Sequence, residues 1–278
     1  MKSIFDDVSN DCSKIVTKTY STSFSLATKM LSKSIRQHIY NIYGFVRFAD
    51  EIVDTFHEYD KATLLATFKA DTYAALDNGI SLNPILHRFQ LTYNQFKIDR
   101  ALLDAFLYSM EMDLSQQSHD QASYNQYIFG SAEVVGLMCL KIFCNGDEGQ
   151  YEVLKPSAQR LGAAFQKVNF LRDIKADFVG MERMYFPNCD FSNFSLADKQ
   201  AIEVDIQADF DAAFEGIKAL PIPCRFGVYV AFKYYYALFK KIKQTNHGAL
   251  LSTRIRIPDI GKLFIVFNAK IRASLNLL

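Results

Sequence analysis

Tryptophan is absent from this sequence of 278 residues, and residues that interrupt helices are few, with 12 Gly and 6 Pro. So little glycine and proline argues against many short strands joined by turns and favours long helices. An excess of charge of one sign is also lacking. Because 31 basic residues balance 30 acidic ones, no overall field favours binding to nucleic acid. With 50% hydrophobic residues, intrinsic disorder is excluded as well.

The five cysteines are scattered without a Cys-x-x-Cys, and the five histidines do not cluster near them. A zinc site and a disulfide framework are therefore disfavoured, and we expect free thiols in a reducing compartment. The N-terminal stretch is polar and acidic, unlike a signal peptide, and no segment reaches the roughly 18 apolar residues of a membrane span. These features predict a soluble, cytoplasmic protein and leave contact with a membrane surface open.

Apolar residues recur at spacings of three and four along the chain, without internal repeats or linkers. This period predicts one all-α domain over residues 1–278. Lys155-Pro156 is typical of a first helical turn, so a helix expected from residue 148 could instead begin there. We expect helices at residues 9–31, 34–55, 61–77, 85–95, 99–116, 122–144, 148–178, 196–219, 224–245 and 259–275.

Four pairs of aspartates are spaced four residues apart: Asp7/Asp11, Asp50/Asp54, Asp173/Asp177 and Asp205/Asp209. On a helix such a pair lies on one face and can share a divalent cation. The first and last pairs lie in polar or acidic stretches, and we interpret both as solvated. The two middle pairs lie among apolar residues, where unpaired carboxylates are costly. These two need a cation in a polar cavity or, alternatively, ion-pair networks of their own.

Arginine and amide side chains accompany the two middle pairs. Arg47 lies one helical turn before Asp50, while Gln166 and Asn169 precede Asp173 on a single stripe. Carboxylates, amides and arginines in one cavity are suited to Mg²⁺ ions and to a polyanion such as diphosphate.

With these motifs the sequence resembles the squalene/phytoene synthase family, which joins two prenyl diphosphates head to head, and especially its bacterial carotenoid members. The family's first motif, Arg-x-x-Asp-(Asp/Glu)-x-x-Asp, matches Arg47, Asp50, Glu51 and Asp54. Its second, Gln-x-x-Asn-x-x-Arg-Asp-x-x-x-Asp, matches Gln166, Asn169, Arg172, Asp173 and Asp177. Shorter matches are Ser21-Thr22-Ser23-Phe24, Met112-Asp113-Leu114, Arg183-Met184-Tyr185-Phe186-Pro187 and Arg254-Ile255-Arg256-Ile257-Pro258, with tyrosines at Tyr127 and Tyr235.

The chain departs from the family pattern at two places. Tyr20 stands where the family usually has His, so a charged contact to phosphate is replaced by a neutral hydrogen bond. Bacterial members commonly read Val-Ala-Gly-Thr-Val-Gly where this chain has Ser-Ala-Glu-Val-Val-Gly at residues 131–136. Glu133 in that stretch either lines the cavity or lies on the helix surface.

The resemblance implies an all-α, class I isoprenoid-synthase-type fold around a central cavity. It implies Mg²⁺, or Mn²⁺ in its place, bound by Asp50, Asp54, Asn169, Asp173 and Asp177. It implies catalytic roles for Asp50, Tyr127, Gln166, Asn169 and Asp173. It implies substrate contacts from Tyr20, Ser21, Ser23, Phe24, Arg47, Arg172, Tyr185, Tyr235 and Arg254.

The expected product depends on the floor of the cavity. Thr28 shares a helix face with Tyr20 and Phe24, and Tyr40 is expected opposite it. A small residue at the floor favours two geranylgeranyl diphosphates and the C40 product phytoene, for which no NADPH is expected. The alternatives are a C30 squalene- or dehydrosqualene-type synthase using farnesyl diphosphate, and a non-catalytic assembly factor with the same fold. The expected partners are prenyl diphosphates and a membrane surface that takes up the hydrocarbon product, without nucleic acid.

Overall fold

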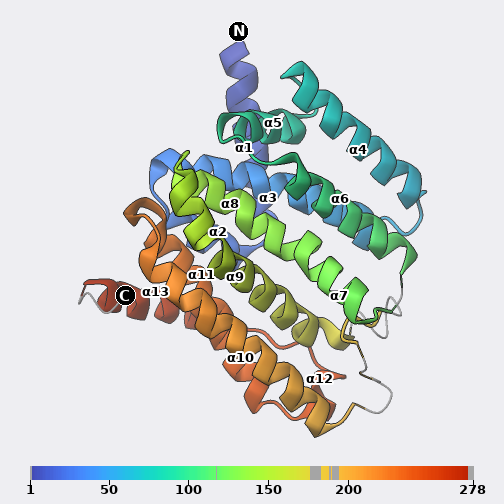
Figure 1. Ribbon diagram of the computed structural model, residues 1–278, viewed down its shortest axis with the longest axis vertical. Helices are drawn as coiled ribbons and strands as arrows, with labels where there is room; N and C mark the ends of the chain where they lie inside the picture. Colours follow the sequence, from blue (N-terminus) through green and yellow to red (C-terminus); the bar gives the residue numbers. More distant parts are fainter. Residues whose placement is uncertain (1, 117, 176–182, 188, 190–193, 275–278) are drawn as a thin grey trace.

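The computed structural model describes residues 2–116, 118–175, 183–187, 189 and 194–274, and helices dominate these segments (Figure 1). Their only strand-like pairing is an isolated bridge between Ser118 and Met184. The helices are α1 Lys2–Tyr20, α2 Thr22–Lys29, α3 Lys33–Asp54, α4 Lys61–Asn78, α5 Pro84–Gln95, α6 Arg100–Ser115, α7 Gln121–Ile128, the π-helix η1 Phe129–Glu133, α8 Val134–Cys144, α9 Glu148–Ile174, α10 Leu196–Ala219, α11 Ile222–Gln244, α12 His247–Leu250 and α13 Asp259–Ser274. The predicted all-α class is confirmed.

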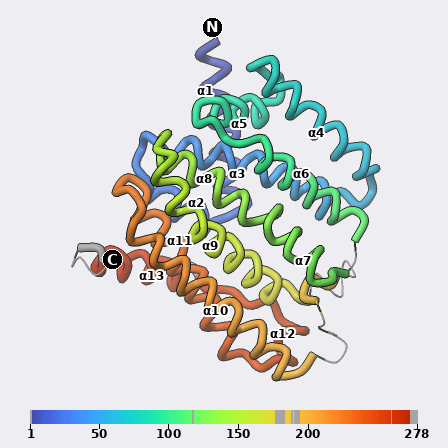
Figure 2. The backbone as a smooth tube through the Cα atoms, in the orientation of Figure 1, coloured from blue at the N-terminus to red at the C-terminus, as the bar shows by residue number. Residues whose placement is uncertain are grey.

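Helix α9 lies between two groups of helices. The N-terminal helices α1, α4 and α5 form one end of the molecule, and α10, α11 and α12 form the other (Figure 2). Helix α9 packs along α8 on one side and along α10 on the other. Aromatic contacts mark the two halves of the core: Phe45 stacks on Phe89 at 3.8 Å between ring centroids in one half, and Phe210 meets Phe232 edge to face in the other.

The first predicted helix differs from the structure, where α1 already begins at Lys2, and the structure also decides between the two expected starts of α9. The expected helix over residues 9–31 is divided at Ser21, whose backbone is extended and whose side chain accepts a hydrogen bond from the Phe24 amide. This is an ordinary N-cap, and it starts a new helix without glycine or proline. Helix α9 begins at Glu148, capped by Asp147, and runs through Pro156. The alternative start at Lys155-Pro156 is therefore wrong.

Residues 121–144, expected as one helix, form a continuous helical span that contains the π turn η1. The span packs closely on α6: a Cβ atom added to Gly130 would lie 2.5 Å from the carbonyl oxygen of Ala105. By length and hydropathy alone, Gln121–Cys144 could cross a membrane, which the sequence analysis did not anticipate. More than half of its apolar window is buried against other helices, so it serves as a core helix here.

The interpretation of Asp205/Asp209 as a solvated face is wrong for Asp209, which is 1% exposed. Lys167 on α9 approaches Asp209 at 2.7 Å and Asp205 at 2.5 Å, and Arg160 approaches Asp209 at 3.0 Å. The cause is the buried ammonium group of Lys167, which requires a carboxylate from the facing helix α10.

Candidate active site

A cavity of about 490 Å³ lies between α9 and the helices α2, α3, α8, α10 and α11. On α9 its lining begins at Leu154 and ends at Arg172, a separation of about 27 Å at 1.5 Å per residue. Polar side chains line the end near Arg172: Tyr20, Ser21, Arg47, Asp50, Gln166, Asn169 and Arg254. Toward Leu154 the walls are apolar and include Leu31, Leu140, Phe143, Ile217 and Leu220.

Helix α3 supplies a carboxylate without a compensating partner. Asp50 has no hydrogen bond or ion pair to another described residue. Burial and then the neighbouring charge of Asp54 raise its pKa to about 7, against the opposing effect of Arg47. Arg47 itself pairs with Glu51, and its guanidinium carbon lies 4.4 Å from the ring centre of Tyr20. The departure at Tyr20 thus places an aromatic ring against an arginine at the cavity wall.

Behind Asp50 lies a third carboxylate, Asp113 on α6, for which the sequence analysis assigned no role. Its side chain is 4% exposed and accepts hydrogen bonds from the hydroxyls of Tyr127 at 2.7 Å and Tyr185 at 3.4 Å. Burial raises its pKa to about 7, although Arg183 at 3.8 Å acts in the opposite direction. The signal in the sequence was the Met-Asp-Leu match itself, in which Asp113 lies between two apolar residues.

The second motif has the opposite charge balance. Asp173, whose side chain is 18% exposed, pairs with Arg172 and with Nε of Arg254 at 2.7 Å. Arg254 follows α12, so the basic segment near the C-terminus folds back onto the end of α9. Asp177, predicted as the partner of Asp173, lies outside the described residues.

Two amides of α9 lie between these charged groups. Nδ2 of Asn169 donates to Oε1 of Gln166 at 3.4 Å, and Nε2 of Gln166 donates to the hydroxyl of Ser131 at 3.3 Å. Oδ1 of Asn169 is buried and has no hydrogen-bond partner among the described residues. A buried acceptor without a partner is costly in an empty site and is suited to a bound cation or ligand.

The structure brings most of the predicted site residues into this cavity: Tyr20, Ser21, Phe24, Arg47, Asp50, Gln166, Asn169, Arg172, Tyr235 and Arg254. Others lie outside its lining: Ser23, Asp54, Tyr127, Asp173 and Tyr185. The two tyrosines bind Asp113 instead, and the two aspartates form ion pairs with arginines.

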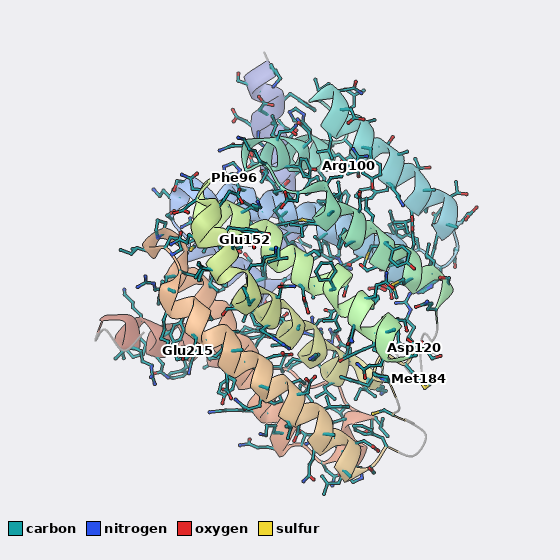
Figure 3. All side chains as sticks on the ribbon, in the orientation of Figure 1. Phe96, Arg100, Asp120, Glu152, Met184 and Glu215 are labelled. Atoms are coloured by element: carbon teal, nitrogen blue, oxygen red, sulfur yellow. The ribbon has the colours of Figure 1, made fainter. Side chains whose placement is uncertain are left out.

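Glu133 does not line this cavity. It accepts a hydrogen bond from Gln159 and faces a separate cavity of about 730 Å³ between α7, α9 and α10. Tyr40, expected opposite Thr28, is 3% exposed and also lies outside the lining. Figure 3 labels Met184 and Asp120, which lie close together at one edge of the molecule. There an isolated bridge pairs Met184 with Ser118, just before α7 begins.

The donor groups can be compared with what Mg²⁺ requires. Within the described segments, no three His, Cys, Asp or Glu side chains converge into a ready-made metal site. Mg²⁺, however, is commonly held by one or two carboxylates, with water and substrate phosphates completing its coordination. Asp50 and Oδ1 of Asn169, both without a hydrogen-bond partner in the described segments, fit a cation of this kind.

A helical fold with a cavity that is charged at one end and apolar over the rest is typical of an enzyme for long apolar chains that carry a charged head. Residues 17–260 match the model of the squalene/phytoene synthase family. The chain belongs to this family, and its membership makes it a prenyltransferase-type enzyme acting on prenyl diphosphates.

Proteins similar in sequence to this chain are named after different products. The phytoene synthase of Arthrospira platensis is 26% identical, over 93% of this chain and 91% of its own length. The presqualene diphosphate synthase of Rhodopseudomonas palustris is 30% identical over 60% of this chain, a match that spans only 58% of that relative. The 4,4'-diapophytoene synthase of Staphylococcus haemolyticus is 27% identical, over 71% of this chain and 68% of its own length.

Solved structures share the fold. A dehydrosqualene synthase in complex with a ligand superposes with a TM-score of 0.84 at 19% identity, covering 97% of this chain and 98% of that one. A squalene synthase from Alicyclobacillus acidocaldarius has a TM-score of 0.73 at 19% identity, covering 87% and 95%. This similarity confirms the isoprenoid-synthase-type helical fold.

Proposed function

We propose that this prenyltransferase condenses two geranylgeranyl diphosphates through a cyclopropylcarbinyl diphosphate to phytoene, with release of diphosphate. The observation that carries the proposal is the shape and polarity of the cavity. Its polar end presents Arg47, Arg172 and Asp50, and the whole cavity, which is mainly apolar beyond that end, extends about 27 Å along α9. One such cavity can hold charged heads at one end and prenyl tails in the rest.

The residues of the polar end have distinct tasks in this proposal. Arg47 and Arg172 hold the diphosphates by charge-assisted hydrogen bonds, and Arg254 keeps Asp173 in place. Mg²⁺ would be held by Asp50, Asp54, Asn169, Asp173 and Asp177. When bound, it neutralises negative charge on the leaving diphosphate.

The walls inside the cavity stabilise the allylic cation that forms when one substrate ionises. The amides of Gln166 and Asn169 lie beside the path from the polar end to the tails, and Tyr235 stacks on Phe165 at 3.9 Å in the same wall. Aromatic faces and oriented amide dipoles stabilise positive charge, and a dry apolar wall keeps water from quenching it. Tyr127 lies outside the cavity lining and acts indirectly, through the hydrogen bond that its hydroxyl donates to Asp113.

Small side chains along the walls support a C20 substrate. Thr28 lines the cavity, and its hydroxyl donates to the carbonyl of Phe24 at 2.8 Å. Gly216 and Gly227 also line it, from α10 and α11. A Cβ atom on Gly227 would lie 2.4 Å from Cδ2 of Leu31 and 3.1 Å from the carbonyl oxygen of Ala27, so this glycine lets α11 approach the C-terminal end of α2 at the wall of the cavity.

The test is incubation of purified protein with Mg²⁺ and a mixture of farnesyl and geranylgeranyl diphosphates, with and without NADPH, followed by mass spectrometry of the products. Phytoene formed without NADPH is expected. Exclusive formation of a C30 hydrocarbon would overturn the substrate assignment. Accumulation of the cyclopropylcarbinyl diphosphate alone would show that the enzyme stops halfway, and absence of any condensation product would overturn the function.

A matched pair of variants tests the role of the cavity floor. Thr28→Phe should shift turnover from geranylgeranyl toward farnesyl diphosphate, because the larger ring overpacks the wall. Lys29→Phe, one residue further along and exposed, should leave chain-length preference unchanged. Equal preferences in both variants would show that Thr28 does not set product length.

A further inference from the structure

Helix α13 is apolar on two sides. One side packs inward on α11, where Ala269 is fully buried. The other side is exposed and carries five large apolar side chains: Ile260 at 71%, Leu263 at 64%, Phe264 at 63%, Phe267 at 61% and Ile271 at 42% exposed. Their spacings of three, four, seven and eleven residues place them on a single arc of about 100°. We call these five residues the outer arc.

The helix that carries the outer arc is joined to the walls of the active-site cavity. Helix α13 lies at the edge of the molecule beside α11 (Figure 1). Nζ of Lys262 donates to the hydroxyl of Thr22 at 2.7 Å and thereby joins α13 to the first residue of α2. The preceding residue, Ser21, lines the polar end of the cavity. The helix that carries the outer arc is therefore attached to two walls of the cavity, α2 and α11.

The charge around the outer arc is mainly positive. Residues 255–274 contain four basic side chains, Arg256, Lys262, Lys270 and Arg272, against the single acidic residue Asp259. On α11, Lys233 lies close enough to Arg272 of α13 and to Lys240 to interact with both electrostatically, so these lysines add to the positive charge. A helix with an apolar arc flanked by Lys and Arg is typical of segments that lie in the interface of an anionic bilayer.

The size of the outer arc also distinguishes a bilayer from a second protein chain. Stable protein interfaces use about 20–30 residues a side. The outer arc offers five side chains on one helix, too few for such an interface but enough to insert into lipid. We propose that the outer arc inserts at the boundary between the headgroups and the acyl chains of an anionic membrane and holds the enzyme there peripherally. The lipid contact stands apart from the reaction; its use for delivering an apolar product rests on the proposed function.

The experiment measures co-sedimentation of the full chain, without substrate, with vesicles of phosphatidylglycerol and phosphatidylcholine. In one variant the arc is made polar: Leu263→Ser, Phe264→Ser and Phe267→Ser. The matched control changes three similarly exposed residues of α1: Ile4→Ser, Val8→Ser and Ile15→Ser, which are 65%, 55% and 60% exposed. Wild type and control should bind alike, and the arc variant should bind at least about tenfold more weakly. Binding of wild type should weaken at high salt and on pure phosphatidylcholine vesicles.

Three outcomes would overturn the proposal: wild type that stays in solution, an arc variant that binds as well as wild type, or a control variant that loses binding equally. Light scattering adds a further check, because a dimer that is lost in the arc variant, without lipid binding, would assign the arc to a second copy. Circular dichroism and turnover in detergent should match between wild type and the arc variant. Lipid binding by a protein that makes no condensation product would overturn the proposed function and leave the membrane contact intact.

Discussion

The two aspartate motifs share one spacing but occupy opposite electrostatic surroundings. On α3, Asp50 forms no ion pair with any residue that the structure describes, and burial together with nearby carboxylates raises its pKa to about 7. On α9, Asp173 is paired with two arginines, one of them from the basic segment after α12. Spacing along a helix therefore identifies candidate carboxylates, whereas the charge they present depends on what the fold places against them.

This difference suggests a division of labour at the polar end of the cavity. The α3 side, with Asp50 and its neighbour Asp54, has an excess of negative charge and is suited to a cation. The α9 side carries positive charge on Arg172 and Arg254 and is suited to a diphosphate. Variants that alter one side and leave the other intact can test this division.

Asp50→Asn should have the largest effect. Loss of the carboxylate removes negative charge where the cation is needed, and we expect turnover to fall by about 10²–10³-fold, with a raised Mg²⁺ requirement. Asp7→Asn, on the exposed side of α1, is the control and should change little. Asp205→Asn is a poor control because Asp205 partners the buried Lys167. Similar losses in Asp7→Asn and Asp50→Asn would contradict the assignment.

Asp173→Asn should lower turnover less, by about 10-fold, and should raise the Mg²⁺ requirement less than Asp50→Asn does. The loss is smaller because Arg172 and Arg254 no longer pair with Asp173 in this variant and become free to bind diphosphate, which offsets part of the damage. Mg²⁺ titrations of the initial rate in both variants measure the difference. An equal shift of the Mg²⁺ requirement in the two variants would remove the electrostatic distinction between the motifs.

Stability in EDTA should depend on pH through Asp50 and Asp113. Because their folded pKa values of about 7 exceed the ordinary value of 3.8, the folded protein holds more protons than the unfolded chain between these limits. Their contribution to stability is therefore lost as pH rises toward 7, by up to about 1.4 kcal/mol per pH unit for each group.

Melting curves at pH 5.5 and 7.5 measure this effect. Relative to wild type, Asp113→Asn should reduce the fall in Tm between the two pH values by about 2–4 °C. Asp104→Asn changes a half-exposed aspartate of the same helix and serves as the control. An unchanged pH dependence in Asp113→Asn would show that Asp113 titrates in its ordinary range.

The smallest effect is expected at Tyr20. If its hydroxyl contacts phosphate, Tyr20→Phe should raise the KM for the diphosphate substrate by roughly 2- to 12-fold, as expected for one neutral hydrogen bond. The ring over Arg47 is preserved in this variant, whereas Tyr20→Ala also removes the cation–π contact. Steady-state kinetics of both variants separate the two contributions. Unchanged kinetics in Tyr20→Phe would mean that only the ring matters.

Periodicity in the sequence predicted the class and most helices, because an apolar stripe at a spacing of three and four records which face is buried. It missed the division at Ser21, since an N-cap needs no residue that is foreign to helices. The cavity residues Asp50, Gln166 and Asn169 were found because each lies on one stripe with other polar residues. What surrounds a side chain was harder to predict: neither Lys167 beside Asp209 nor Tyr127 beside Asp113 is visible in local sequence. These contacts join residues far apart in the chain, so only the tertiary fold reveals them.

The π turn η1 has a consequence for how this protein can tolerate change. Each residue advances an α-helix by about 100°, so the wider turn at Phe129–Glu133 sets the rotational phase between α7 and α8. In the present phase Tyr127 points toward Asp113 while Ser131 and Val135 face the cavity. Deleting one residue from the turn would restore regular α-helix and rotate one half against the other. A change that keeps every chemical group would then dismantle the site, so the length of this turn is as much a part of the catalyst as its side chains.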